Sequence, residues 1–324
     1  MEGIMRGGSL VGGLVVVGLI AACHRKIEHV EPPVASTKTA GPHDPKTDAL
    51  IAQLDTERMK TQLTKLVGFG TRHATSPTFT QVLSYCEGEM TALGYTPVRQ
   101  SVRVGGKESF NLIWEKKGIT DDAVLVTAHV DSINQNLFGK LAPGADDDGS
   151  GTVGTMELAR ILAKESPKQT VRFILWTGEE EGLYGSAQYV KRLTAADKAK
   201  IKGVVQMDMI ATQNGTDAPG VTIEAAPLAQ PMIDGLAQAG ATYTKLAVKI
   251  SLHPTDSDHV SFIKAGVPAV LLIEANDAAN RSMHTPKDAL DKIDWALMKS
   301  ILTMNLAYVA SVAGIAGTGN PPTH

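Results

Sequence analysis

The spacing of apolar residues along the chain follows two patterns, one typical of helices and one typical of buried strands. Between residues 50 and 67 the apolar positions recur at helical intervals, beginning with Leu50, Ile51 and Leu54. Residues 171–177 are instead apolar almost without interruption, as in a strand that is buried on both faces. From residue 123 onward the two patterns alternate. This alternation predicts a three-layer α/β/α sandwich with a central mixed, mostly parallel sheet.

The same patterns predict the element boundaries. Strands are expected at 96–104, 110–115, 123–128, 171–177, 203–209, 221–225, 246–250 and 267–274. Helices are expected at 47–67, 78–93, 152–163, 184–193, 231–239, 258–264 and 295–313. A single domain is therefore expected over residues 48–316, followed by a short tail at 317–324.

The N-terminal residues have a different character. Arg6 precedes a short apolar and Gly-rich run at 10–22, which is typical of an export signal. The run ends in two alanines followed by Cys23, which resembles a bacterial lipobox. We therefore predict a lipoprotein-type signal peptide at 1–22, a lipidated Cys23 and, in the Pro-rich segment 23–47, a disordered linker. A plain signal peptide with an incidental cysteine, or an uncleaved anchor, is the alternative.

Composition and charge limit the partners and the location of the protein. The chain has 324 residues, is 43% hydrophobic and carries a net charge of −3, which is ordinary for a globular protein and gives no reason to expect a nucleic-acid partner. If Cys23 is lipidated, Cys86 has no partner for a disulfide. The protein is then expected in the bacterial cell envelope, facing the periplasm or the cell exterior, with a lipid anchor as its one membrane contact. The sequence does not determine the oligomeric state.

Residues that can bind a divalent metal follow the predicted strands. His129 and Asp131 end the apolar run that starts at residue 123, and a Gly-rich acidic run at 144–151 comes next. Asp208 lies inside an otherwise apolar strand, where an unpaired carboxylate would be costly. Further acids and histidines follow strands at Glu179, Glu180, Asp258, His259 and His284. Because open α/β sheets bind ligands at the carboxyl ends of their strands, we expect these side chains to meet there.

In this combination and order, the motifs resemble those of a known enzyme family. The pair His129-x-Asp131, the acidic run 144–151, Glu179-Glu180, Asp208 and Met283-His284-Thr285 look like those of the co-catalytic zinc aminopeptidases of the bacterial leucyl aminopeptidase type, over residues 50–316. That family also includes the animal-type glutaminyl cyclases. The resemblance implies an exopeptidase that hydrolyses N-terminal residues from peptides, using a water activated by two zinc ions.

The resemblance also implies a role for each site residue. The zinc ligands would be His129, Asp147, Glu180, Asp208 and His284. Asp147 would be shared by both ions, with Asp146 and Asp148 as neighbours rather than ligands. Glu179 would be the general base. Asp131 would accept a hydrogen bond from the far ring nitrogen of His129. Imidazole and carboxylate are ligands that zinc accepts, which is consistent with this set.

Several alternatives stay open at this stage. The acidic run has the spacing of an EF-hand calcium loop, although a predicted strand rather than a helix precedes it. A glutaminyl cyclase-like acyltransferase with one zinc, a carboxypeptidase and a non-catalytic surface binding lipoprotein are the other functions considered for this fold. Asp258 either supports the metal site or caps the next helix. Some family members place a Tyr near the position of His253, and this chain lacks it. The native metal and the preferred N-terminal residue are not determined, since histidine and carboxylates also suit other divalent ions.

Overall fold

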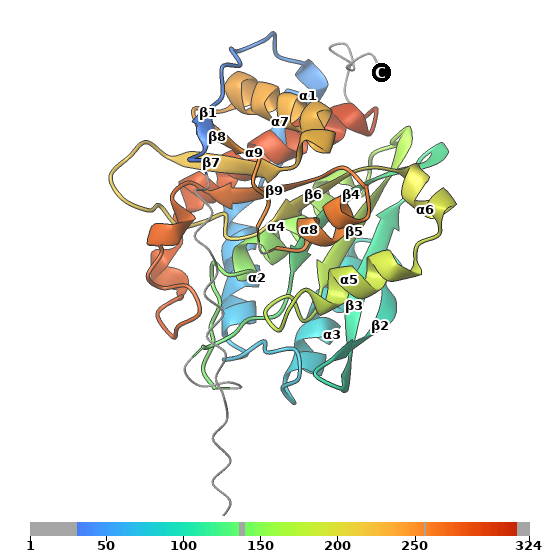
Figure 1. The fold of residues 1–324 in the computed structure, drawn as a ribbon, viewed down its shortest axis with the longest axis vertical. Coiled ribbons are helices and arrows are strands. Elements are labelled where there is room, and N and C mark those ends of the chain that lie inside the picture. The colour runs from blue at the N-terminus through green and yellow to red at the C-terminus, as the bar shows by residue number, and fades with distance from the viewer. Residues whose placement is uncertain (1–30, 136–139, 256, 316–324) are drawn as a thin grey trace, which may run out of the picture. The chain divides into compact units, whose positions relative to one another are not determined.

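A mixed sheet of nine strands forms the centre of the described part of the protein, in the order β1-β8-β7-β9-β6-β4-β5-β3-β2 (Figure 1). The computed structural model describes residues 31–135, 140–255 and 257–315, which all belong to one compact unit. The predicted signal peptide, Cys23 and the C-terminal tail lie outside the described residues. The strands are β1 (Val34–Ala35), β2 (Val98–Val104), β3 (Lys107–Lys116), β4 (Thr120–His129), β5 (Gln169–Trp176), β6 (Ile201–Met207), β7 (Gly220–Ala225), β8 (Ala247–Ser251) and β9 (Ala269–Glu274).

Parallel pairing is concentrated at the centre of this sheet. The neighbours β9, β6, β4 and β5 are all parallel to one another. Antiparallel strands flank them on both sides, because β3 pairs with β5 and β7 pairs with β9 in the opposite direction. The predicted α/β sandwich with a mixed sheet is therefore confirmed, and the four central strands all present their carboxyl ends at one edge.

Helices cover both faces of the sheet. Alternate residues of a strand point to opposite faces, so each central strand packs against both helical layers. Leu125 and Trp176 pack on one face against α5 and α8, whereas Val126 and Leu175 belong to the larger core under α2, α3, α4, α7 and α9. Figure 1 shows α5 and α8 in front of the sheet and α2 and α4 behind it. The helices are α1 (Pro45–Ile51), α2 (Thr56–Val67), α3 (Phe79–Ala92), α4 (Gly149–Leu162), α5 (Tyr184–Arg192), α6 (Ala195–Lys200), α7 (Gln230–Tyr243), α8 (His259–Lys264) and α9 (Trp295–Val312).

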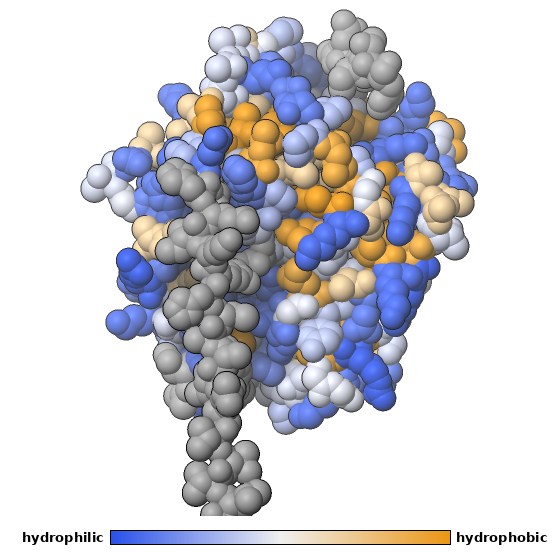
Figure 2. Space-filling view, in the orientation of Figure 1, coloured by the Kyte–Doolittle hydropathy of each residue, from blue (hydrophilic) through white to orange (hydrophobic). Residues whose placement is uncertain are grey.

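The surface in front of the sheet is mostly polar. In the orientation of Figure 1, polar side chains cover much of this face, and apolar ones gather beside α7 and α8 in the upper half of the view (Figure 2). Among the described helices, α9 alone is long and apolar enough to span a membrane by length and composition, but 67% of it is buried inside the protein. It therefore serves here as a core helix.

The N-terminal part of the described chain differs from the prediction in two ways. The single helix expected at 47–67 is two helices, because Asp55 ends the first pattern and its carboxylate accepts the Arg58 N–H at 3.0 Å as the cap of α2. Part of the segment predicted as a disordered linker is ordered, since β1 pairs with β8 at the sheet edge. This edge strand is held by backbone hydrogen bonds, which do not depend on residue type. The Pro-rich sequence around it therefore gave no sign of a strand.

Candidate active site

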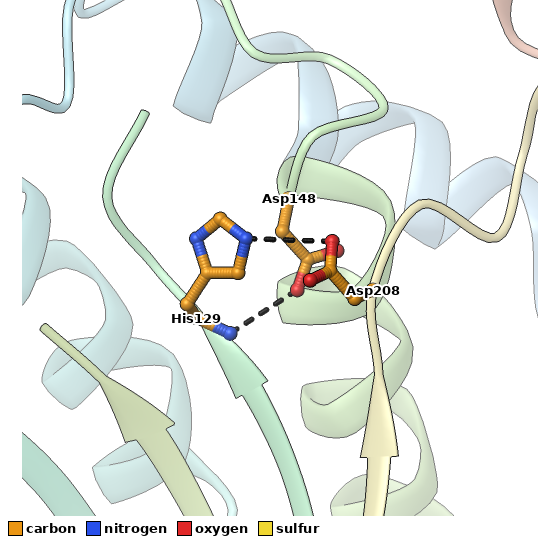
Figure 3. Close-up of side chains that lie close together, drawn as sticks. All are labelled: His129, Asp148 and Asp208. Atoms are coloured by element: carbon orange, nitrogen blue, oxygen red, sulfur yellow. Dashed lines mark hydrogen bonds and ion pairs between the residues drawn. The ribbon is translucent and has the colours of Figure 1, made fainter. Parts of the chain in front are cut away.

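The carboxyl ends of the central strands bring the predicted site residues together. β4 ends at His129, Asp208 directly follows β6, and Glu179 and Glu180 come shortly after β5. The acidic run leads into the start of α4, and Figure 3 shows Asp148 there, beside His129 and Asp208. Parallel strands meet at one edge, and for this reason residues far apart in the sequence converge.

Asp147 lies between the two histidines. Its Oδ1 atom is 3.3 Å from His129 Nε2, and its Oδ2 atom is 3.0 Å from His284 Nε2. Each histidine also faces a second acid: His129 Nε2 lies 3.4 Å from Asp208 Oδ1, and His284 Nε2 lies 3.0 Å from Glu180 Oε2. The five predicted ligands therefore form two adjoining groups, and Asp147 belongs to both.

Two clusters of donor atoms have the spacing of a metal site. Asp147, Glu180 and His284 form one, and His129, Asp148 and Asp208 form the other, with donor atoms within 4.8 Å of one another in each. Asp148 is nevertheless engaged with the backbone. Its Oδ1 accepts the N–H groups of Gly151 and Met209, and its Oδ2 accepts the N–H of His129 (Figure 3). Asp148 thus caps α4 and ties it to the strand ends, while Asp147 has the oxygens that face both histidines.

The electrostatics of the site favour positive charge. Burial opposes protonation of His284, but hydrogen bonds to Asp147 and Glu180 raise its pKa to about 10. Burial and the charge of Asp147 raise the pKa of Glu180 to about 7. The Glu180 Oε1 atom is buried without a hydrogen-bond partner in the described part of the protein. Clustered carboxylates and imidazoles with an unpartnered oxygen are surroundings that suit a divalent cation.

Glu179 lies at the same site. Burial raises its pKa well above the ordinary value, while the charge of His129 opposes this and that of Asp208 adds to it. Its backbone N–H and that of Glu180 both point at Asp131, whose Oδ1 and Oδ2 accept them at 3.4 and 3.2 Å. A cation bound among these groups would favour the ionised form of Glu179.

The predicted hydrogen bond between His129 and Asp131 is not formed. The His129 Nδ1 atom is 3.8 Å from Asp131 Oδ1, which is longer than a hydrogen bond. The physical reason is that the Asp131 oxygens face the amides of Glu179 and Glu180 instead. Asp131 therefore positions the segment that carries the predicted base.

The segment after β8 supports the site from another side. The Ser257 hydroxyl donates to Asp208 Oδ2 at 2.8 Å. Asp258 is fully buried, and burial raises its pKa to about 7. It precedes α8 but makes no side-chain capping hydrogen bond, so the helix-cap alternative is wrong. His253 is exposed, and its role stays a prediction.

Two residues that were not predicted as part of the site, Asp288 and Arg72, fix the acidic run, and the role of Arg72 is structural. Asp288 is buried, and its two oxygens accept the N–H groups of Asp146 and Asp147 at 2.9 and 3.0 Å. Arg72 is fully buried, and its guanidinium donates to three backbone carbonyls, those of Val130, Pro143 and Gly144.

No sequence signal identifies either residue. Burial lowers the pKa of Arg72, while the carboxylate of Asp288 and those of the acidic run oppose this. The side chains of Arg72 and Asp288 both bond to backbone groups. Every residue has such groups, so these contacts leave no pattern of residue types in the sequence. The calcium-loop alternative requires an entering helix, but β4 precedes the acidic run, and the described residues between β4 and α4 (130–135 and 140–148) contain no helix.

Comparison with known proteins identifies the family. Residues 111–309 match Peptidase family M28. The curated Leucine aminopeptidase 1 of Blastomyces gilchristii is 30% identical over 285 residues, covering 82% of this chain and 74% of that protein. The crystal structure of the LapA aminopeptidase of Legionella pneumophila has a TM-score of 0.74 at 24% identity and covers 87% of this chain and 77% of its own. That of a zinc aminopeptidase from Bacillus subtilis has a TM-score of 0.55 at 26% identity, covering 64% and 51%. The resemblance inferred from the motifs is confirmed, and the chain belongs to Peptidase family M28.

Proposed function

We propose that this chain is a zinc-dependent aminopeptidase that removes N-terminal residues from peptides, with two metal ions held around Asp147. The position of Asp147 carries the proposal, because one carboxylate presents an oxygen to each of two histidines, His129 and His284. Membership of a peptidase family and the similarity to a leucine aminopeptidase support the substrate class.

The donor set fits two zinc ions. His129 and Asp208 would hold one ion, Glu180 and His284 would hold the other, and Asp147 would be shared. Each ion then has three protein ligands, which leaves a position open as catalytic zinc sites require. Zinc held by these residues would supply a Lewis acid able to polarise the scissile carbonyl and to lower the pKa of water.

The residues of the chain supply the proton transfer and the positioning. Glu179 accepts a proton from the attacking water and returns it to the leaving amine. Asp131 accepts the N–H groups of Glu179 and Glu180, so one carboxylate fixes the base and a ligand together. Ser257 orients Asp208 through its hydroxyl. Positioning by such outer groups is as important to metal sites as the ligands themselves.

Replacement of the base tests this mechanism. Glu179→Gln should lower kcat for a leucine anilide by about 10²–10⁴-fold, the usual contribution of a general base, and leave the zinc content unchanged. Glu57→Gln is the matched control, because Glu57 is 81% exposed on α2 and should change neither value. A Glu179→Gln enzyme that works at the full rate would refute the assignment of the base.

Metal analysis tests the number of ions and the nearest alternative. A chelator should abolish activity, and two equivalents of zinc should restore it. Asp147→Asn should weaken both ions because both histidine groups share this carboxylate. One equivalent of zinc, with cyclisation of N-terminal Gln peptides and no anilide hydrolysis, would instead support the glutaminyl cyclase-like function.

We further propose that the protein is exported and lipid-anchored through Cys23. Arg6, the apolar run at 10–22 and the two alanines before Cys23 support this. In a bacterial host, the wild-type protein should partition into the detergent phase, and Cys23→Ser should shift it to the aqueous phase. Equal partitioning of the two would contradict lipidation.

A further inference from the structure

The imidazole of His284 contacts acids on one side and a single glutamine on the other. Its Nε2 atom faces Asp147 and Glu180, each at 3.0 Å. Its Nδ1 atom lies 2.6 Å from Nε2 of the Gln135 side-chain amide, 149 residues away in the sequence. The backbone N–H of Gln135 also donates to the His284 carbonyl at 3.2 Å. Gln135 therefore holds both the main chain and the ring of His284.

We propose that Gln135 is a positioning residue for the second metal ion, which acts by fixing the ring orientation of His284. This inference rests on the two-ion site proposed above. A histidine that binds a metal through Nε2 carries its proton on Nδ1 and donates it to a neighbouring acceptor. A half-turn of the Gln135 amide presents Oε1 to that proton, since the amide offers an acceptor and a donor on the same plane.

The two histidines differ in how much they need such a partner. The His129 side chain is 1% exposed, so surrounding atoms hold its ring, and its Nδ1 makes no hydrogen bond in the described part of the protein. The His284 side chain is 23% exposed, so packing restricts its ring less. A hydrogen bond at Nδ1 supplies the orientation that packing does not supply.

The main chain around His284 is held independently of the Gln135 side chain. His284 has a φ of 57°, in the left-handed region. The Asn280 Oδ1 atom accepts the N–H groups of Ser282 and Met283 and so anchors the preceding turn. The Gln135 N–H bond is also a backbone bond. Substitution of the Gln135 side chain therefore removes the contact to the ring and leaves these bonds in place.

Zinc affinity is the test of this proposal. Competition with a chelator should show two zinc ions of measurable affinity in the wild-type enzyme. Gln135→Leu should weaken one of them by about 10–100-fold, the usual effect of removing the partner of a metal-bound histidine. The other ion should keep its affinity. Gln135→Glu keeps an acceptor for Nδ1–H and should restore the affinity of the weakened ion.

A matched control and a reference variant complete the experiment. Gln53→Leu makes the same change at an exposed glutamine whose amide donates to the Ala49 carbonyl, and both affinities should stay unchanged. His284→Ala identifies the weaker ion by removing its ligand. Wild-type affinities in Gln135→Leu, or equal weakening of both ions, would overturn the role of Gln135. A wild-type enzyme that binds one ion, unaffected by His284→Ala, would instead refute the two-ion site itself.

Discussion

Removal of the buried Arg72 guanidinium should be among the most damaging substitutions outside the metal ligands. Its Nε and two Nη atoms donate to Val130, Pro143 and Gly144 at 2.8, 2.6 and 2.8 Å. The Gly144 carbonyl keeps another donor, the Gly149 N–H at 3.1 Å. In Arg72→Leu the other two carbonyls lose their charged donor, and an unsatisfied buried group costs about 1–3 kcal/mol. Loss of the buried positive charge beside carboxylates adds to this, so we expect about 3–5 kcal/mol in total.

Urea unfolding measures this loss directly. Arg72→Lys should fall between wild type and Arg72→Leu, because a lysine keeps the charge but lacks the planar fork that reaches several carbonyls. Arg99→Leu is the control: its side chain is 30% exposed and paired with Glu87, so about 0–1 kcal/mol is expected. If Arg72→Leu costs no more than Arg99→Leu, the guanidinium does not support the acidic run and this reasoning is refuted.

Two further predictions concern the backbone and the pH dependence. Gly144 and Gly105 have nearly the same φ, 53° and 54°. A Cβ atom added at Gly144 would lie 2.5 Å from the Asp147 carbonyl oxygen, whereas one added at Gly105 would meet no atom within 4 Å. Gly105→Ala should therefore cost about 1 kcal/mol, and Gly144→Ala clearly more, with loss of zinc; equal costs in urea unfolding would contradict the clash. Burial lowers the pKa of His259 to about 3, so below about pH 6.5 the unfolded chain takes up a proton at this residue that the folded chain does not. The contribution of His259 to stability should therefore decrease as the pH falls, by up to about 1.4 kcal/mol per pH unit. His259→Gln should remove this contribution, so the unfolding free energies of the variant and the wild type should change differently between about pH 6.5 and pH 5. If the two free energies change in parallel over this range, His259 does not contribute.

Much of the fold could be predicted from the sequence because strand burial depends on local composition. The apolar run before His129 and the run ending at Trp176 both correspond to strands, β4 and β5. The helix at 47–67 was predicted as one element, because its apolar spacing continues across Asp55. Only the capping hydrogen bond to the Arg58 N–H shows where α2 begins. The edge strand β1 was missed, since two residues held by backbone bonds carry no periodicity.

The predicted site residues converge in the structure, but one predicted contact does not form. His129 and Asp131 are two residues apart, and a hydrogen bond between them was expected from the resemblance. The direction of the Asp131 carboxylate depends instead on the amides after β5, which approach it through the parallel pairing of β4 and β5. The resemblance therefore placed Asp131 at the site correctly, but its hydrogen-bond partners are the amides of Glu179 and Glu180 rather than His129.

By itself, the sequence determined which residue types stand at the strand ends, and hence the family, the chemistry of the donors and the site's place at one sheet edge. These properties are local, because a strand end and a His-x-Asp pair can be recognised from a few neighbouring residues. The resemblance to the family already indicated Asp147 among the acids 146–148, and the structure places its two oxygens at both histidines. Tertiary structure alone decided which residues support Asp147. The contacts of Asp147 with Asp288 and of His284 with Gln135 span 141 and 149 residues. Such contacts depend on strand register and on backbone groups, and neither leaves a pattern in the order of side chains.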